Sequence, residues 1–88
     1  MSSSKGNNPE LWEKLLNTLD ERLQLGLLDH LRRVSSYHFE DKLLIIEPLN
    51  SNDHEYLTRK AVQQQLETFA KDITKVERLE IKASYAKD

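Results

Sequence analysis

The longest uninterrupted apolar run in the chain extends only from Leu43 to Ile46, and it is the strongest sign of a strand. Pro48 cannot donate a hydrogen bond to a sheet ladder, so we expect this strand to end by Glu47. Successive side chains of a strand point to opposite faces, so apolar side chains reach both faces of the sheet here. The expected assignment is Leu44 and Ile46 on one face, Leu43 and Ile45 on the other.

The segment before this strand predicts its hairpin partner. Residues from Val34 to Phe39 alternate weakly and are rich in β-branched, aromatic and hydroxyl side chains. The polar pair Glu40-Asp41 follows them and has the character of a turn. We therefore expect a hairpin whose second strand is Lys42 to Glu47.

Apolar positions at helical spacing predict two helices before the hairpin. Asn8 is a good cap and Pro9 suits the first helical position. Gly26 weakens one long helix, so we expect a break between Asp20 and Gly26. Trp12 is predicted to anchor the core, with an exposed binding hot spot as the alternative. The apolar positions are Leu11, Trp12, Leu15, Leu16 and Leu19, then Leu23, Leu27, Leu28 and Leu31.

A third helix should begin between Ser51 and Asp53. Its core-facing stripe is Val62, Leu66, Phe69 and Ile73. Tyr56 and Leu57 do not lie on that stripe. Either the helix bends near Arg59, or these two side chains make a separate contact with the sheet edge or with the helix that carries Trp12.

The third helix should end at Thr74-Lys75, and a half-buried strand follows it. Residues from Val76 to Ala83 alternate, with Leu79 and Ile81 inward and charged residues outward. The last residues, 84–88, form a polar tail.

The resulting order, α-α-β-β-α-β, predicts an α+β domain with a three-stranded sheet and helices packed on one face. We assign residues 1–8 to a flexible linker or an expression remnant, residues 9–83 to a single KH-like interaction domain, and residues 84–88 to the tail. The less covered face of the sheet is a candidate interaction surface.

Composition narrows the function classes. The chain has 88 residues, which suits one modest core, and its formal net charge is −2. A slightly acidic domain has no overall electrostatic attraction to nucleic acid or anionic lipid. The chain has no cysteine, which excludes disulfides and thiolate metal sites. No spanning or signal-like run is evident, so we expect a cytoplasmic protein without membrane contact.

The sequence offers no catalytic constellation, and we expect neither enzyme activity in this segment nor a metal or other cofactor. The three histidines, His30, His38 and His54, lie far apart and lack metal-ligand spacing. Carboxylate pairs fall at predicted turns and caps, where capping and solubility explain them. The two glycines, Gly6 and Gly26, make no phosphate-binding loop.

The element order invites comparison with KH domains, which bind single-stranded nucleic acid through a Gly-x-x-Gly loop between two helices. This chain lacks such a loop. The basic residues Arg32, Arg33, Arg59 and Lys60 leave weak nucleic-acid binding open. A solvated charged face, with Glu67 and Asp72 nearby in sequence, is the favoured interpretation.

The chain resembles two related bacterial replication modules between Pro9 and Lys82. The opening Leu11-Trp12-Glu13-Lys14-Leu15-Leu16 and the closing Leu79-Glu80-Ile81 are similar to both. One is the C-terminal domain of the tau subunit of the DNA polymerase III clamp loader, and the other is the N-terminal domain of the replication initiator DnaA. The tau version is the better match for the run Tyr56-Leu57-x-x-x-Ala61-x-Gln63-Gln64-x-Leu66-x-x-x-Ala70.

This resemblance implies a non-catalytic KH-like domain. In tau the region contacts the polymerase α subunit and tethers it to the clamp loader, whose ATPase motifs would lie elsewhere in a longer chain. The DnaA module self-associates and contacts the replicative helicase and regulators. DnaA proteins usually carry a second aromatic residue early in the second helix, and Leu27-Leu28-Asp29-His30-Leu31 has none. The resemblance to the tau domain is therefore the preferred interpretation.

A partner surface should use exposed side chains outside the core stripes. The candidates are Tyr37, Tyr56 and Leu57, together with Arg59 and Lys60. The alternative, slightly favoured, is that Tyr37, Tyr56 and Leu57 pack helix against sheet.

Overall fold

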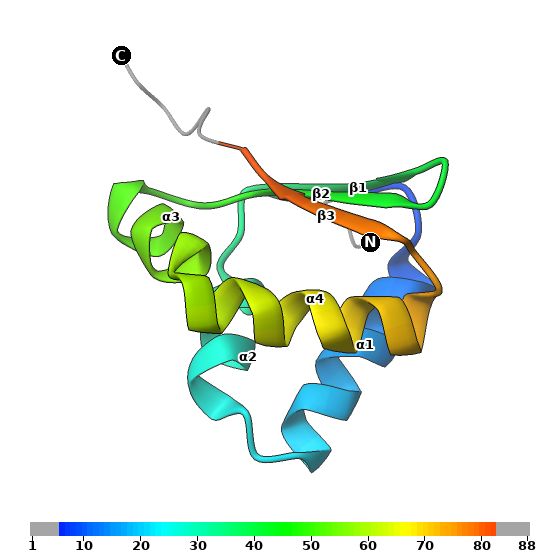
Figure 1. Cartoon of the computed structure of the whole chain (residues 1–88), viewed down its shortest axis with the longest axis horizontal. Helices are drawn as coiled ribbons and strands as arrows, with labels where there is room; N and C mark the ends of the chain where they lie inside the picture. The colour runs from blue at the N-terminus through cyan, green and yellow to red at the C-terminus, as the bar shows by residue number, and fades with distance from the viewer. Residues whose placement is uncertain (1–5, 83–88) are drawn as a thin grey trace, which may run out of the picture.

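A computed structural model describes residues 6–82 of the chain and shows an α+β domain (Figure 1). Three strands form a mixed sheet in the order β1-β2-β3, with β1 and β2 antiparallel and β2 and β3 parallel. The helices lie together on one side of this sheet (Figure 1). The elements are α1 (Pro9–Glu21), α2 (Leu25–Arg32), β1 (Ser36–Glu40), β2 (Leu43–Glu47), α3 (Ser51–Thr58), α4 (Lys60–Thr74) and β3 (Arg78–Ile81).

The start of α1 follows the predicted capping chemistry. The side-chain oxygen of Asn8 accepts a hydrogen bond from the backbone N–H of Leu11 at 3.3 Å, and Pro9 occupies the first turn. The predicted break after α1 is confirmed. Leu23 has a positive φ of 61° and turns the chain between α1 and α2, which then begins at Leu25 without a side-chain cap.

The hairpin is confirmed, but its boundaries differ from the prediction. Strand β1 begins at Ser36 rather than Val34, and the turn is centred on Asp41 and Lys42 rather than on Glu40 and Asp41. Glu40 pairs with Leu43, which leaves a two-residue loop with φ of 48° and 64°. These left-handed residues suit the twist of a tight hairpin, although neither is glycine.

The predicted third helix is two helices. Arg59 has φ −59° and ψ 137°, which is extended backbone, so α3 ends and α4 begins around it. Of the two alternatives given for Tyr56 and Leu57, the bend near Arg59 is therefore confirmed. At the other end, Lys75 adopts a left-handed conformation that closes α4, and the strand that follows starts at Arg78 rather than Val76.

The core lies between the helices and the inner face of the sheet. Leu44 and Ile46 of β2 are fully buried there, which confirms the predicted assignment of the two faces. The ring of Trp12 on α1 stacks on that of Tyr37 on β1, with centroids 4.2 Å apart. Trp12 is therefore a core anchor. The remaining buried apolar residues are Leu15, Leu16, Leu19, Leu27, Leu28, Leu31, Val34, Leu57, Leu66, Ala70 and Val76.

Residues just before α1 belong to the fold. The side-chain amide of Asn7 donates to the carbonyl oxygen of Phe39 at 2.7 Å, and its oxygen accepts from the N–H of Phe39 at 2.8 Å. A Cβ on Gly6 would overlap the backbone and ring of Tyr37. The expected linker over residues 1–8 is therefore wrong for residues 6–8. Residues 1–5 and the expected tail at 84–88 lie outside the described residues.

The left-handed conformation of Lys42 gives a test of the hairpin. We expect Lys42→Gly to raise the free energy of unfolding by about 0.5–1 kcal/mol, because glycine adopts positive φ without a steric cost. Urea denaturation measures the effect. Lys42→Ala is the matched control: it also removes the 3.8 Å ion pair with Glu77 but keeps the strained backbone. A stability gain in the alanine variant as large as in the glycine variant would refute the backbone explanation.

Candidate interaction surfaces

Two of the predicted partner-binding residues are buried in this structure. Tyr37 has 3% of its surface exposed and Leu57 has none. Both pack between helices and sheet, so the slightly favoured alternative is confirmed for these two residues and their candidate exposure is wrong. The weak alternation of β1 left both possibilities open for Tyr37, because it does not show which face is inward. Leu57 precedes the break at Arg59, so helical spacing counted through that break gives the wrong phase.

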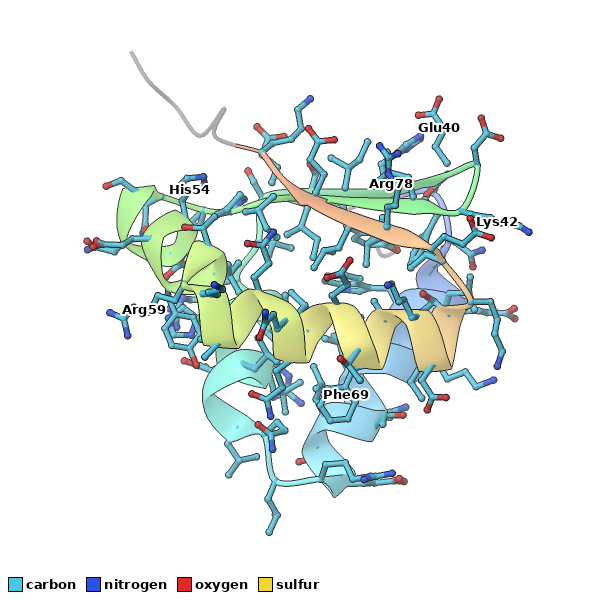
Figure 2. All side chains as sticks on the ribbon, viewed as in Figure 1. Glu40, Lys42, His54, Arg59, Phe69 and Arg78 are labelled. Atoms are coloured by element: carbon cyan, nitrogen blue, oxygen red, sulfur yellow. The ribbon has the colours of Figure 1, made fainter. Side chains whose placement is uncertain are left out.

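The other three predicted residues gather where α3 meets α4. Tyr56 is half-buried, and its ring stacks on that of His30 from α2, with centroids 3.8 Å apart and planes within 9°. The guanidinium carbon of Arg59 lies 5.6 Å from the centre of the Tyr56 ring. Lys60 is exposed beside it. Figure 2 shows Arg59 reaching outward from the α3–α4 corner.

Asp53 joins this corner to α2. Its side chain is 4% exposed and accepts hydrogen bonds from Arg33 at 2.9 and 3.4 Å. The same guanidinium donates to Asp29 at 2.7 Å. The hydrogen bond to Asp53 raises the pKa of Arg33 above its ordinary value, so the guanidinium stays charged. The buried carboxylate therefore has a permanent cationic partner.

His30 completes this α2–α3 junction. Its Nδ1 lies 2.8 Å from the carbonyl oxygen of Gly26, so Nδ1 carries the proton and donates it. Its Nε2 faces Asp53 at 3.6 Å. Three contacts define a positioning cluster: the His30–Tyr56 ring stack, the Arg33–Asp53 ion pair and the His30–Gly26 hydrogen bond. The cluster is made of His30, Arg33, Asp53 and Tyr56, and it sets the orientation of α3 against α2.

The outer face of the sheet is the second candidate surface, and no described helix covers it (Figure 1). Leu43 and Ile45 of β2 are half-buried at its centre. The register places Leu43 between Glu40 and Arg78, and Ile45 between His38 and Glu80. Figure 2 shows Glu40 and Arg78 rising from the side turned away from the helices. We call the face formed by Ser36, His38, Glu40, Leu43, Ile45, Glu47, Arg78, Glu80 and Lys82 the open face.

The open face is shallow and chemically mixed. A depression of about 250 Å³ lies over Ile45 and is lined by residues of β1 and β2 and by Lys82, which follows β3. An apolar centre with charged flanks is the usual composition of a protein interaction surface. Among the polar groups that line the depression, the Ser36 hydroxyl donates to Glu47 at 3.0 Å, and Nε2 of His38 lies 3.5 Å from Glu40. The chemistry of the open face is suited to docking another protein.

A third exposed apolar feature lies at the connection between α1 and α2. Leu23 and Leu25 are 76% and 54% exposed, and the side chain of Gln24 between them accepts a hydrogen bond from Gln65 on α4 at 2.8 Å. These leucines are two isolated side chains rather than a continuous patch, and scattered exposed leucines are common. The open face is therefore the stronger candidate.

Residues 6–82 contain neither a metal-binding cluster nor a membrane-spanning helix. In that part of the chain, no group of three or more His, Asp or Glu side chains could hold a metal ion. No helix there is long and apolar enough to cross a bilayer. Comparison with family models, with curated proteins and with solved structures returns no match.

The buried carboxylate of the positioning cluster should matter for stability. We expect Asp53→Ala to lower the free energy of unfolding by more than Asp29→Ala does, because it removes the buried acceptor through which Arg33 holds α3 against α2. Asp29→Ala is the control, since the Asp29 side chain is 65% exposed, and we expect its effect to stay within about 0.5 kcal/mol. Urea denaturation that gives equal losses for both variants would contradict this role of Asp53.

Proposed function

We propose that this chain is a non-catalytic protein–protein interaction domain of the bacterial replication machinery, similar to the tau C-terminal domain. In this role it tethers the clamp loader to the α subunit of DNA polymerase III in the cytoplasm. The resemblance between Pro9 and Lys82 supplies the replication context. The observation that supports an interaction role is the open face, with apolar Leu43 and Ile45 bordered by charged side chains.

The open face has a favourable layout for recognising a protein. A partner that covers Leu43 and Ile45 gains about 25 cal/mol for each Å² of apolar surface removed from water. The flanking rows differ in charge: Glu40 lies across Leu43 from Arg78, and Glu80 lies across Ile45 from His38. Such a pattern selects one orientation of a complementary partner.

The α3–α4 corner extends this proposed surface at a second position. Tyr56, Arg59 and Lys60 are the predicted partner residues that remain accessible to a partner, and the positioning cluster holds Tyr56 in place. Tyrosine and arginine are enriched among residues that contribute most to binding. We assign the corner a secondary role, because its aromatic ring is already stacked on His30.

The DnaA-type module is the close alternative, and it predicts the replicative helicase as partner. Weak binding of single-stranded nucleic acid is a second alternative, and the structure gives it less support. Arg33 is already paired with Asp29 and Asp53, so part of the candidate basic patch is neutralised. Arg59 lies beside Tyr56 rather than in a continuous basic groove.

The direct test is a calorimetric titration of this chain with purified polymerase α subunit and, separately, with purified replicative helicase. We expect saturable binding to the α subunit. Ile45→Lys should weaken it at least tenfold, because a charge then replaces the apolar centre of the open face. Ile45→Val keeps the apolar branched side chain and should bind like the wild type, and Gln64→Lys places the same charge on an exposed position of α4.

Each outcome of this titration has a definite meaning. Binding to helicase alone would replace the tau-like function with the initiator-like one. Absence of binding to both proteins by a folded chain would overturn the proposed function. Titration with single-stranded DNA should stay flat even at low salt, where binding to the phosphate backbone is strongest. A salt-sensitive isotherm lost in an Arg59→Glu/Lys60→Glu variant would favour the nucleic-acid alternative.

A further inference from the structure

The two edges of the sheet differ in how their backbone groups are used. At the β1 edge, the side chain of Asn7 occupies both the N–H and the carbonyl oxygen of Phe39. Asn7 thus stands in for a neighbouring strand and blocks further pairing there. An edge strand with unpaired backbone groups is a template for another strand, and natural proteins commonly block it.

The β3 edge has no such block among residues 6–82. The N–H of Arg78 donates to the carbonyl oxygen of Lys42, just before β2, at 3.2 Å, and the N–H of Lys82 donates to that of Ile46 in β2 at 2.8 Å. Alternate residues of a strand direct their backbone groups to opposite sides, so those of Leu79 and Ile81 point away from β2. No described residue makes a hydrogen bond with these outward groups.

The side chains of β3 carry a self-complementary charge pattern. Arg78, Glu80 and Lys82 are exposed on the open face and carry positive, negative and positive charge in turn. Among the described residues, none of the three takes part in an ion pair within 4.0 Å. Cross-strand pairs of opposite charge stabilise a sheet, and like charges directly opposite destabilise it.

We propose that the β3 edge pairs antiparallel with β3 of a second copy of this chain, with the two-fold axis at Leu79. Leu79 then exchanges both backbone hydrogen bonds with Leu79 of the partner subunit. Arg78 faces Glu80 of the partner subunit, and the symmetry repeats this contact, which gives two pairs of opposite charge. A register centred on Glu80 would set like charges against each other at every outward position.

This pairing joins two three-stranded sheets into one of six strands. A two-fold axis perpendicular to the sheet keeps both sets of helices on the same side, so the two open faces become continuous. The dimer therefore presents a doubled surface while leaving Ile45 uncovered. A short edge-to-edge contact buries much less than the roughly 1,600 Å² of a standard interface. We therefore expect a dimer that forms and dissociates rapidly and whose population rises with protein concentration.

Amide hydrogen exchange of the full chain, measured by NMR at low and high protein concentration, tests the pairing directly. The Leu79 amide should exchange rapidly in the dilute protein and become at least tenfold more protected as the concentration rises. The Glu80 amide is the internal control, because it donates to β2 in the monomer and stays protected throughout. Sedimentation velocity on the same samples reports the change in mass.

Charge variants distinguish this dimer from one that forms through a different surface. Glu80→Arg and Arg78→Glu should each weaken dimerisation at least tenfold, because each creates two like-charge contacts. The double variant Arg78→Glu/Glu80→Arg should restore it, because the reversed charges are again complementary. Glu67→Arg on α4 is the control and should leave it unchanged.

The proposal is overturned by a protein that stays monomeric with a rapidly exchanging Leu79 amide at high concentration. It is also overturned by a dimer in which Leu79 stays unprotected, or in which the charge variants have no effect. Protection of Leu79 only when the polymerase α subunit is added would assign the edge to a different protein. The Ile45 variants should dimerise normally, so failure here and failure of the proposed function are distinguishable.

Discussion

The structure depends on the packing of the helices against one face of the sheet. Leu44 and Ile46 lie fully buried in that interface, and the Trp12–Tyr37 stack ties α1 to β1 at the same layer. A domain of this size buries a limited share of its surface, so one apolar layer supplies most of its stability. Concentrating the helices on one face leaves no helix of residues 6–82 over the other face. The same constraint that builds the core therefore creates the open face.

Local backbone conformation keeps this arrangement compact. Positive φ at Asp41 and Lys42 gives the hairpin its two-residue loop, and the extended backbone at Arg59 redirects the chain from α3 into α4. The positioning cluster then fixes α3 on α2 through a buried carboxylate and a stacked ring pair. Polar side chains of the positioning cluster are thus used at the joint between α2 and α3.

The uninterrupted apolar run from Leu43 to Ile46 was enough to predict that apolar side chains reach both faces of the sheet, because strand periodicity and Pro48 act locally. Helix order, the break after α1 and the inward direction of Leu79 were predictable for the same reason. The exposure of Tyr37 and Leu57 was not, since it depends on which face of β1 meets Trp12 and on the bend at Arg59. Contacts between distant residues, such as Asn7 with Phe39 and Arg33 with Asp53, leave no periodic signal in a single sequence. The candidate site was therefore only partly predictable. Its apolar centre could be predicted from the sequence. The residues of the α3–α4 corner and of the charged rows come together only in the folded chain, so their grouping could not.

The most direct test of this account compares methyl groups along β2. Leu43, Leu44, Ile45 and Ile46 are consecutive residues of the same strand, so the main difference between them is the face of the sheet that each side chain occupies. Solvent paramagnetic relaxation, measured by methyl NMR on dilute protein with a soluble probe, reports how closely water approaches each side chain. The account predicts strong relaxation enhancement at Leu43 and Ile45 and little at Leu44 and Ile46. Equal enhancement at all four positions, or the reverse pattern, would contradict the one-sided packing on which the open face depends.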